Sequence, residues 1–135
     1  MSRLSQAAAC ALLVVAVSSC SNPTSTTPTT VAATITDTFS GTLAQGSSAA
    51  WNFTVGGSGT ITITLVALAP QSTITMGVGI GSPGTSGCSI TSSQENVRVG
   101  SPIQGTLNAG AYCIALYDLG NMTAANTYTL TVLHP

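Results

Sequence analysis

The stretch Thr60-Ile61-Thr62-Ile63-Thr64-Leu65 alternates a hydroxyl side chain with an aliphatic one at every position. Successive side chains of a β-strand point to opposite faces of a sheet, so this period of two predicts a strand with one polar and one apolar face. The stretch Thr127-Tyr128-Thr129-Leu130-Thr131-Val132 repeats the pattern near the C-terminus. Both stretches are therefore expected to be half-buried strands of a β-sheet domain.

Five further segments complete the expected set of strands. In one of them Trp51, Phe53 and Val55 share a face by the same alternation, and the others are residues 34–39, 76–80, 103–107 and 111–117. Turn residues such as Gly56-Gly57-Ser58-Gly59 separate these segments, and no segment shows a sustained helical period. The pattern predicts an all-β domain over residues 34–135, an antiparallel β-sandwich of the jelly-roll or immunoglobulin-like kind with about seven or eight short strands.

The composition excludes several classes of partner. Charged residues make up 4% of the 135-residue chain, against about a quarter of a typical soluble domain, and there is no lysine. With so few cations, electrostatic attraction to nucleic acid or to anionic lipid headgroups is not expected. Hydrophobic residues make up 44% of the chain, which favours a folded core over a disordered Ser/Thr tract.

The N-terminal region has the features of an export signal. Arg3 precedes an apolar run over residues 7–17, which is far shorter than the roughly 20 residues that span a bilayer, so residues 1–19 are expected to be a signal peptide. The joint Val17-Ser18-Ser19-Cys20 resembles the lipobox of bacterial lipoproteins. The resemblance implies a diacylglycerol group on Cys20 and cleavage before it. The alternative is an ordinary secretory peptide with Cys20 as an incidental thiol.

Residues 20–33 form an expected tether between the lipid and the domain. Ser21 to Thr30 are all Ser, Thr, Asn or Pro, and a segment without apolar residues has no core to fold around. One acyl chain binds a membrane only marginally, so lasting attachment depends on the several chains that a lipidated cysteine carries. The expected location is the bacterial cell envelope, and Ser21 hints at the outer membrane by analogy with enteric bacteria.

The remaining cysteines predict one disulfide. Cys10 leaves with the signal peptide and Cys20 takes lipid, so Cys88 and Cys113 form an even pair in an oxidising compartment. Closing a loop of about 25 residues stabilises a domain by roughly 3 kcal/mol in the chain-entropy model. The alternative is two unpaired buried thiols. With the bond, the Gly-rich stretch of residues 77–92 is expected to lie across the outside of a sheet.

Residues 39–132 resemble the bacterial pre-peptidase C-terminal domain, a small β-sandwich appended to exported proteins. The resemblance rests on GTLAQGSSAAWNFTV (residues 41–55), GTITITL (residues 59–65), and the stretches at 109–117 and 128–132. It implies a non-catalytic accessory module. Some relatives bind calcium through clustered carboxylates, but Asp37, Glu95 and Asp118 are far apart in this sequence and a calcium ion needs six to eight oxygens. No metal and no cofactor are expected.

The sequence offers no catalytic set of residues. The one histidine, His134, is penultimate and is expected to be a packed or solvated terminal residue rather than a general base. Gly84-Thr85-Ser86-Gly87 is not the Gly-x-Ser-x-Gly nucleophile elbow. Asp118 is expected to bond the backbone amides of its turn, and Arg98 to pair with Glu95 on a loop. The protein is expected not to be an enzyme.

Two functions stay open at this stage. In the first, the domain is a surface recognition module that binds a polysaccharide or an envelope protein, with Trp51 and Tyr117 as candidate ligand contacts. Trp51 is alternatively a core residue, because it alternates with Phe53 and Val55. In the second, the domain is a structural or assembly component of the envelope with no soluble ligand. An aromatic side chain in a cleft would favour the first function, and an unprotected sheet edge the second.

Overall fold

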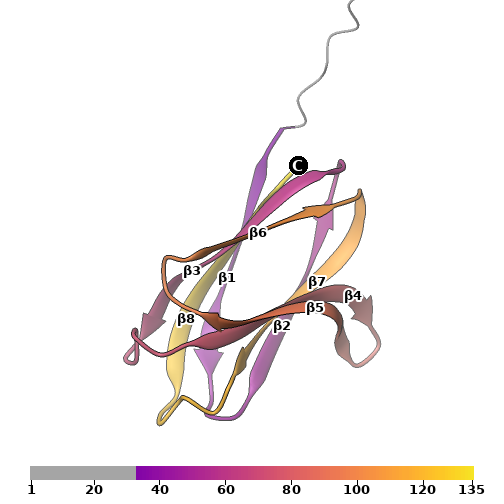
Figure 1. Cartoon of the computed structure of the whole chain (residues 1–135). Coiled ribbons are helices and arrows are strands. Elements are labelled where there is room, and N and C mark those ends of the chain that lie inside the picture. Colours follow the sequence, from indigo (N-terminus) through magenta and orange to yellow (C-terminus); the bar gives the residue numbers. More distant parts are fainter. Residues whose placement is uncertain (1–32) are drawn as a thin grey trace, which may run out of the picture. The chain divides into compact units, whose positions relative to one another are not determined.

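Alternating side chains build two four-stranded antiparallel sheets that pack face to face (Figure 1). The structure is a computed structural model that describes residues 33–135. Its strands are β1 (Ile35–Leu43), β2 (Ser48–Val55), β3 (Gly59–Ala69), β4 (Met76–Gly84), β5 (Gly87–Val97), β6 (Pro102–Leu107), β7 (Gly110–Asp118) and β8 (Asn126–His134). One sheet has the order β1-β8-β3-β6 and the other β2-β7-β4-β5, which is the order of a jelly roll. The expected β-sandwich is confirmed.

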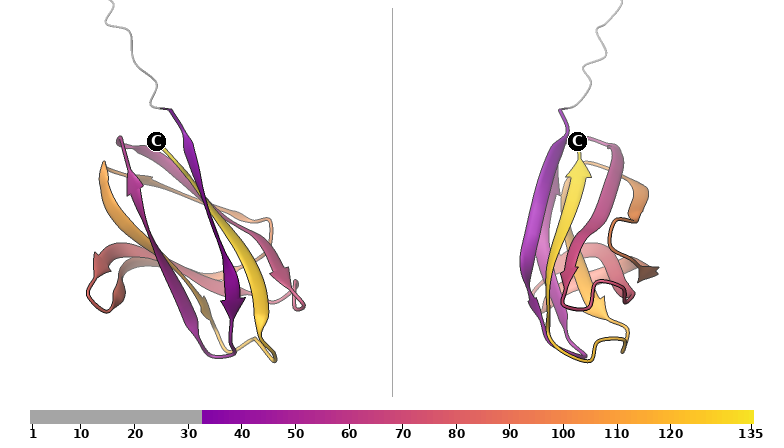
Figure 2. Two further views of the ribbon diagram at one scale, coloured as in Figure 1. Left: turned by 180° about the vertical axis from the view of Figure 1, so that it is seen from behind. Right: turned by 90° about the vertical axis from the view of Figure 1, so that its left-hand side faces the viewer.

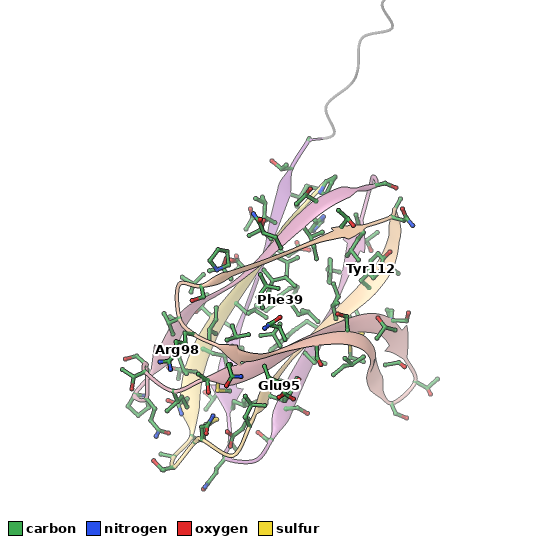
Figure 3. All side chains as sticks on the ribbon, in the orientation of Figure 1. Phe39, Glu95, Arg98 and Tyr112 are labelled. Carbon is green, nitrogen blue, oxygen red and sulfur yellow. A yellow bond between two sulfur atoms is a disulfide. The ribbon has the colours of Figure 1, made fainter. Side chains whose placement is uncertain are left out.

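The two alternating threonine stretches lie side by side in the middle of one sheet. Residues 60–65 belong to β3, where Ile61, Ile63 and Leu65 are buried, and residues 127–132 belong to β8, which pairs with β3. Their inward side chains meet those of the other sheet in one hydrophobic core. Figure 3 shows Phe39 inside the sandwich, where it packs against this core. Burial of alternate residues on the inner face is what holds the register of such strands.

The strand β5 departs from the sequence prediction. Residues 77–92 were expected to cross the outside of a sheet. Instead β4 lies within the sheet as far as Gly84, and β5 forms an eleven-residue edge strand beside it. Ser89 to Asn96 are all exposed, so β5 has no apolar face and no alternation that a sequence pattern could detect. Only the first part of β5 crosses the outer face, as described below.

The sandwich has two open sides, and at each of them one edge strand of each sheet is found. Figure 1 looks onto the side where β5 and β6 are the edges, and the left view of Figure 2 looks onto the opposite side, with β1 and β2. The C-terminus lies beside the start of β1, because Ile35 is the register partner of His134 (Figure 2).

Side-chain amides join the loops at the end of the sandwich away from the C-terminus. The loop after β3 begins with a cis peptide bond between Ala69 and Pro70. The next residue, Gln71, donates its backbone amide to Oδ1 of buried Asn126 at 2.8 Å, and Asn126 Nδ2 donates back to Gln71 Oε1 at 3.0 Å. These bonds hold the β3–β4 loop against the start of β8.

The expected N-terminal features lie outside the described residues. These are the signal peptide (1–19), the lipidated Cys20 and nearly all of the tether (20–33). Within residues 33–135, no helix is both long enough and apolar enough to cross a membrane.

Candidate functional site

The outer face of the β2-β7-β4-β5 sheet carries unusually small side chains. Along β4 the outward positions 77, 79 and 81 are glycine, whereas the alternate Val78 and Ile80 point toward the other sheet. Register partners place these glycines in three rows that run across β2, β7 and β4: Ser48-Tyr117-Gly77, Ala50-Ala115-Gly79 and Asn52-Cys113-Gly81. The absent side chains leave room on this face for another segment of the chain.

The first part of β5 occupies that room. A Cβ atom on Gly81 would lie 1.8 Å from the backbone oxygen of Ser89, and one on Gly79 would lie 2.7 Å from Cδ1 of Ile90. The contact at Gly81 is with backbone and excludes any side chain, so glycine is required there, whereas a side chain at position 79 would displace the side chain of Ile90. Beyond β4, the beginning of β5 also contacts β7 and β2.

The disulfide holds this crossing in place. Cys88 of β5 is bonded to Cys113 of β7, with 5.5 Å between the Cα atoms, so the bond passes from the edge strand over β4. The predicted pairing of these two cysteines is confirmed. Cys113 is fully buried beneath the crossing segment. The tip of the β4–β5 hairpin is therefore fixed above the sheet rather than free beside it.

A cleft lies between this tip and the sheet. We call it the hairpin cleft, and its lining residues are Ser48, Ala50, Ser86, Gly87, Cys88, Ile90, Ala115 and Tyr117. Its volume is about 530 Å³, and none of these side chains is charged at neutral pH. Ala50 and Ala115, which are register partners, belong to its floor. Hydroxyl groups from Ser48, Ser86 and Tyr117 supply its hydrogen-bonding capacity.

Tyr117 is held in a fixed position at the cleft. Its half-buried ring covers Gly77, where an added Cβ would lie 2.1 Å from the ring atom Cε2. A ring packed in this way loses little conformational freedom when a ligand binds, which lowers the entropic cost of binding. The structure thus brings one of the two predicted contact residues into a cleft.

Trp51, the other predicted contact residue, is not part of the hairpin cleft. Its half-buried ring stacks on Phe39, with centroids 5.5 Å apart, and meets Tyr128 edge-on at 5.3 Å. Trp51 therefore packs against the core between the sheets, in agreement with its alternation with Phe53. Burial raises the pKa of Tyr128, so its hydroxyl stays protonated at neutral pH.

Asp118 bonds four backbone amides, as expected for a turn residue. Its Oδ1 accepts from Gly120, Asn121 and Met122 at 2.9 to 3.1 Å, and its Oδ2 accepts from Gly46 at 2.9 Å. Partial burial acts to raise the pKa of this carboxyl, but the four donors together hold the pKa below its ordinary value. Asp118 thereby joins the β1–β2 turn to the β7–β8 loop, and all four of these hydrogen bonds serve a structural role.

The histidine is packed rather than solvated. His134 is 1% exposed, its ring lies 5.5 Å from that of Phe53, and its Nε2 lies 3.1 Å from Oδ2 of Asp37. Its Nδ1 lies 3.1 Å from the backbone oxygen of Pro135. Both partners are acceptors when Asp37 is ionised, so both contacts are hydrogen bonds only when the imidazole carries two protons.

The remaining charged residues do not form a cluster. The expected Glu95–Arg98 salt bridge is absent from residues 33–135, because Glu95 lies in β5 and Arg98 donates from Nη1 to the backbone oxygen of Thr73 at 3.2 Å. Figure 3 shows both residues on the β5 side of the domain. In the same part of the chain, no three His, Cys, Asp or Glu side chains are grouped so that they could hold a metal ion.

Most residues of the hairpin cleft were not predictable from the sequence. No sequence pattern marks Ser48, Ala50, Ser86 or Ile90 as cleft residues. They line one cleft only because of the path that β5 takes over the sheet. One signal was present in the alternation Gly77-Val78-Gly79-Ile80-Gly81, which indicates a strand with one face free of side chains.

Comparisons with protein-family models, with curated proteins and with solved structures find no match to this chain. The resemblance to pre-peptidase C-terminal domains stays a prediction from sequence.

Proposed function

We propose that this chain is a non-catalytic, lipid-anchored recognition module of the bacterial cell envelope that binds an uncharged saccharide in the hairpin cleft. The observation that carries the proposal is the cleft itself, which combines hydroxyl groups, small floor residues and a fixed tyrosine ring without a charged side chain. Ligand sites commonly combine apolar surface with a few well-placed polar groups. A charged ligand would lose hydration in this cleft without gaining an ionic partner.

The expected anchor supports this role. A lipid on Cys20 and the polar tether behind it would hold the domain close to a membrane, which suits display to a ligand outside the cell or in the periplasm. The resemblance to pre-peptidase C-terminal domains, which are accessory modules, supports the same role.

A second candidate function, assembly within the envelope, is favoured by the edge strand β5. Exposed edges are commonly protected by lysine, proline or shortness, but β5 is eleven residues long and has neither residue. Its two register irregularities against β4 and the charge of Glu95 give it some protection. A component of this kind would pair through β5 and would leave the hairpin cleft without a soluble ligand.

A glycan array at low and high salt tests the proposal. Wild type should bind one or more neutral glycans with little loss at high salt, because there are almost no charges to screen. Ala50→Arg, which places a long cation on the cleft floor, should abolish that binding, whereas Thr54→Arg on the same strand outside the cleft should not. Binding that falls steeply with salt would contradict the proposal. So would hydrolysis of a glycan or peptide that is lost on substitution of His134 or Glu95.

A further inference from the structure

The closed end of the β4–β5 hairpin forms an arm that lies beyond the paired part of its sheet. We call residues 82–90 the arm. β4 pairs with β7 only as far as Gly81, whose register partner is Cys113. Beyond Gly81, β4 pairs with β5 alone. Backbone pairing therefore joins the two halves of the arm to each other but not to the middle of the sheet.

A β-bulge lies at the base of the arm. Gly81 pairs with Ile90 and Ile80 with Ser92, so Thr91 is an extra residue in β5. A bulge bends the strands that contain it, and both ribbons bend at this end of the hairpin (Figure 1). The bend carries the arm over the outer face of the sheet, where the arm forms one wall of the hairpin cleft.

The side chains of the arm contribute little to its attachment. All of residues 82–90 are exposed except Cys88, which is half-buried. Ile90 covers Gly79, but Ile90 is itself 45% exposed. Because stabilisation by apolar contact scales with the area removed from water, such contacts hold the arm only weakly. The position of the arm over the sheet therefore depends mainly on the bond from Cys88 to Cys113.

The two sulfur atoms of this bond differ in accessibility. Cys113 is fully buried beneath the crossing segment. Cys88 lies between the small residues Gly87 and Ser89, and it lines both the hairpin cleft and a hollow of about 230 Å³ at the turn of the arm. Thiol–disulfide exchange requires that the attacking thiolate reach a sulfur atom. Cys88 is therefore the sulfur that a thiolate from outside reaches.

We infer that the disulfide is a redox switch of the hairpin cleft, which a dithiol protein opens by attacking Cys88. One thiolate of that protein forms a bond to Sγ of Cys88, and the Cys88–Cys113 bond breaks. The electron pair of the broken bond stays on Sγ of Cys113, which takes up a proton from water. The second thiol of the partner then displaces Cys88 as a thiol. Both cysteines end reduced, and the two partner thiols end as a disulfide.

Reduction removes one wall of the cleft. Once the bond is broken, the arm turns about the bulge at Thr91, and its cleft-lining residues move away from Tyr117. A ligand that needs the closed arm then binds with an affinity reduced by the fraction of molecules in which the arm is closed. This loss of binding rests on the proposed function, whereas the release of the arm does not.

Backbone relaxation measured by NMR tests the release of the arm. The ¹⁵N-labelled full chain is compared before and after reduction with dithiothreitol. Order parameters of residues 82–90 should be about 0.85 in the oxidised chain, the value of rigid backbone, and should fall below about 0.6 on reduction. Those of β7 and β8 should stay at the rigid value. Unchanged order in the arm would overturn the inference. So would loss of order throughout the domain, because the bond would then hold the whole fold.

Ile90→Ala provides the matched control. This variant removes the aliphatic contact of the arm with Gly79 and keeps the disulfide, so its arm should stay rigid until the bond is reduced. An arm that is already mobile in oxidised Ile90→Ala would overturn the inference, because Ile90 rather than the bond would then hold the arm.

Mass mapping tests which sulfur is attacked. The folded chain is treated with reduced glutathione, quenched with acid and digested. Glutathione should be found on Cys88, with Cys113 as a free thiol. Glutathione on Cys113, or on neither cysteine, would overturn the assignment of Cys88.

Saccharide binding separates this inference from the proposed function. The dissociation constant of a neutral glycan selected on the array should rise about tenfold or more on reduction, as expected when the arm is closed in about a tenth of the reduced molecules or fewer. Equal binding before and after reduction would overturn the switch. A chain that binds no glycan in either state contradicts the proposed function, whereas release of its arm on reduction still supports the switch.

Discussion

His134 on the last strand and Asp37 on the first are in contact through their side chains, with 3.1 Å between Nε2 and Oδ2. The two strands are also register partners, so this contact fastens the edge strand β1 to its neighbour near the C-terminus. The histidine ring is at the same time a core residue, because it packs on Phe53.

The first prediction follows from this contact. His134→Ala should lower the free energy of unfolding by about 2 kcal/mol, because it removes a buried ring and leaves a cavity. Asp37→Ala should cost about 1 kcal/mol, the scale of one hydrogen bond to a charged group that is partly solvated. Urea unfolding measures both, with Thr38→Ala on the exposed face of β1 as the control. A loss for His134→Ala no larger than that of the control would show that the contact is not structural.

The second prediction concerns the crossing of β5 over β4. Gly81→Ala should cost about 2–3 kcal/mol, because its methyl group would collide with the Ser89 backbone, which cannot rotate away as a side chain can. Gly105→Ala adds the same methyl group where only Ile61 is near, and should stay within about 0.5 kcal/mol of wild type. Thermal unfolding compares the two variants. Equal stability would mean that β5 does not cross at Gly81.

The third prediction is a pH dependence that arises from Asp118. Its folded-state pKa lies below the ordinary value of 3.8, so its ionised form stabilises the fold above that pH, and this contribution is lost as the pH falls through the folded-state pKa. Asp118→Asn should cost about 1 kcal/mol at neutral pH, a small amount because the carboxylate is largely solvated. The difference between the two proteins should shrink in urea unfolding below about pH 4. A difference that does not change with pH would contradict this origin.

The fourth prediction concerns the membrane anchor. Labelled palmitate should enter the wild type but not Cys20→Ala, and that variant should also remain uncleaved by the lipoprotein signal peptidase. Cys10→Ala serves as the control and should be labelled as wild type is. Equal labelling of wild type and Cys20→Ala would exclude Cys20 as the anchor.

Strands with one buried face were predictable from sequence, and the strand without one was not. The period of two in β3 and β8 arises because alternate side chains enter the core. In β5 the residues from Ser89 to Asn96 are exposed on both faces, so burial imposes no pattern on them. A strand over residues 76–80 was predicted, but its continuation to Gly84 was not, because the reason for glycine at position 81 is a crossing strand that no local pattern shows.

The candidate sites depend on contacts between distant segments, which a single sequence does not display. Cys88 and Cys113 were predictable because counting cysteines leaves one pair. The position of Tyr117 beside the hairpin tip follows from that bond and from the path of β5 together.

The most direct test of the central claim is to locate a bound neutral saccharide on the domain. Each neutral six-sugar glycan that binds on the glycan array is titrated into the ¹⁵N-labelled chain. The changes in backbone amide chemical shifts are then mapped by NMR. We predict that the shifts concentrate at Ser48, Ala50, Ala115, Tyr117 and residues 86–90, and that Ala50→Arg removes them. Absence of any shift at these residues, or shifts confined to other parts of the domain, would contradict the assignment of the hairpin cleft as the recognition site.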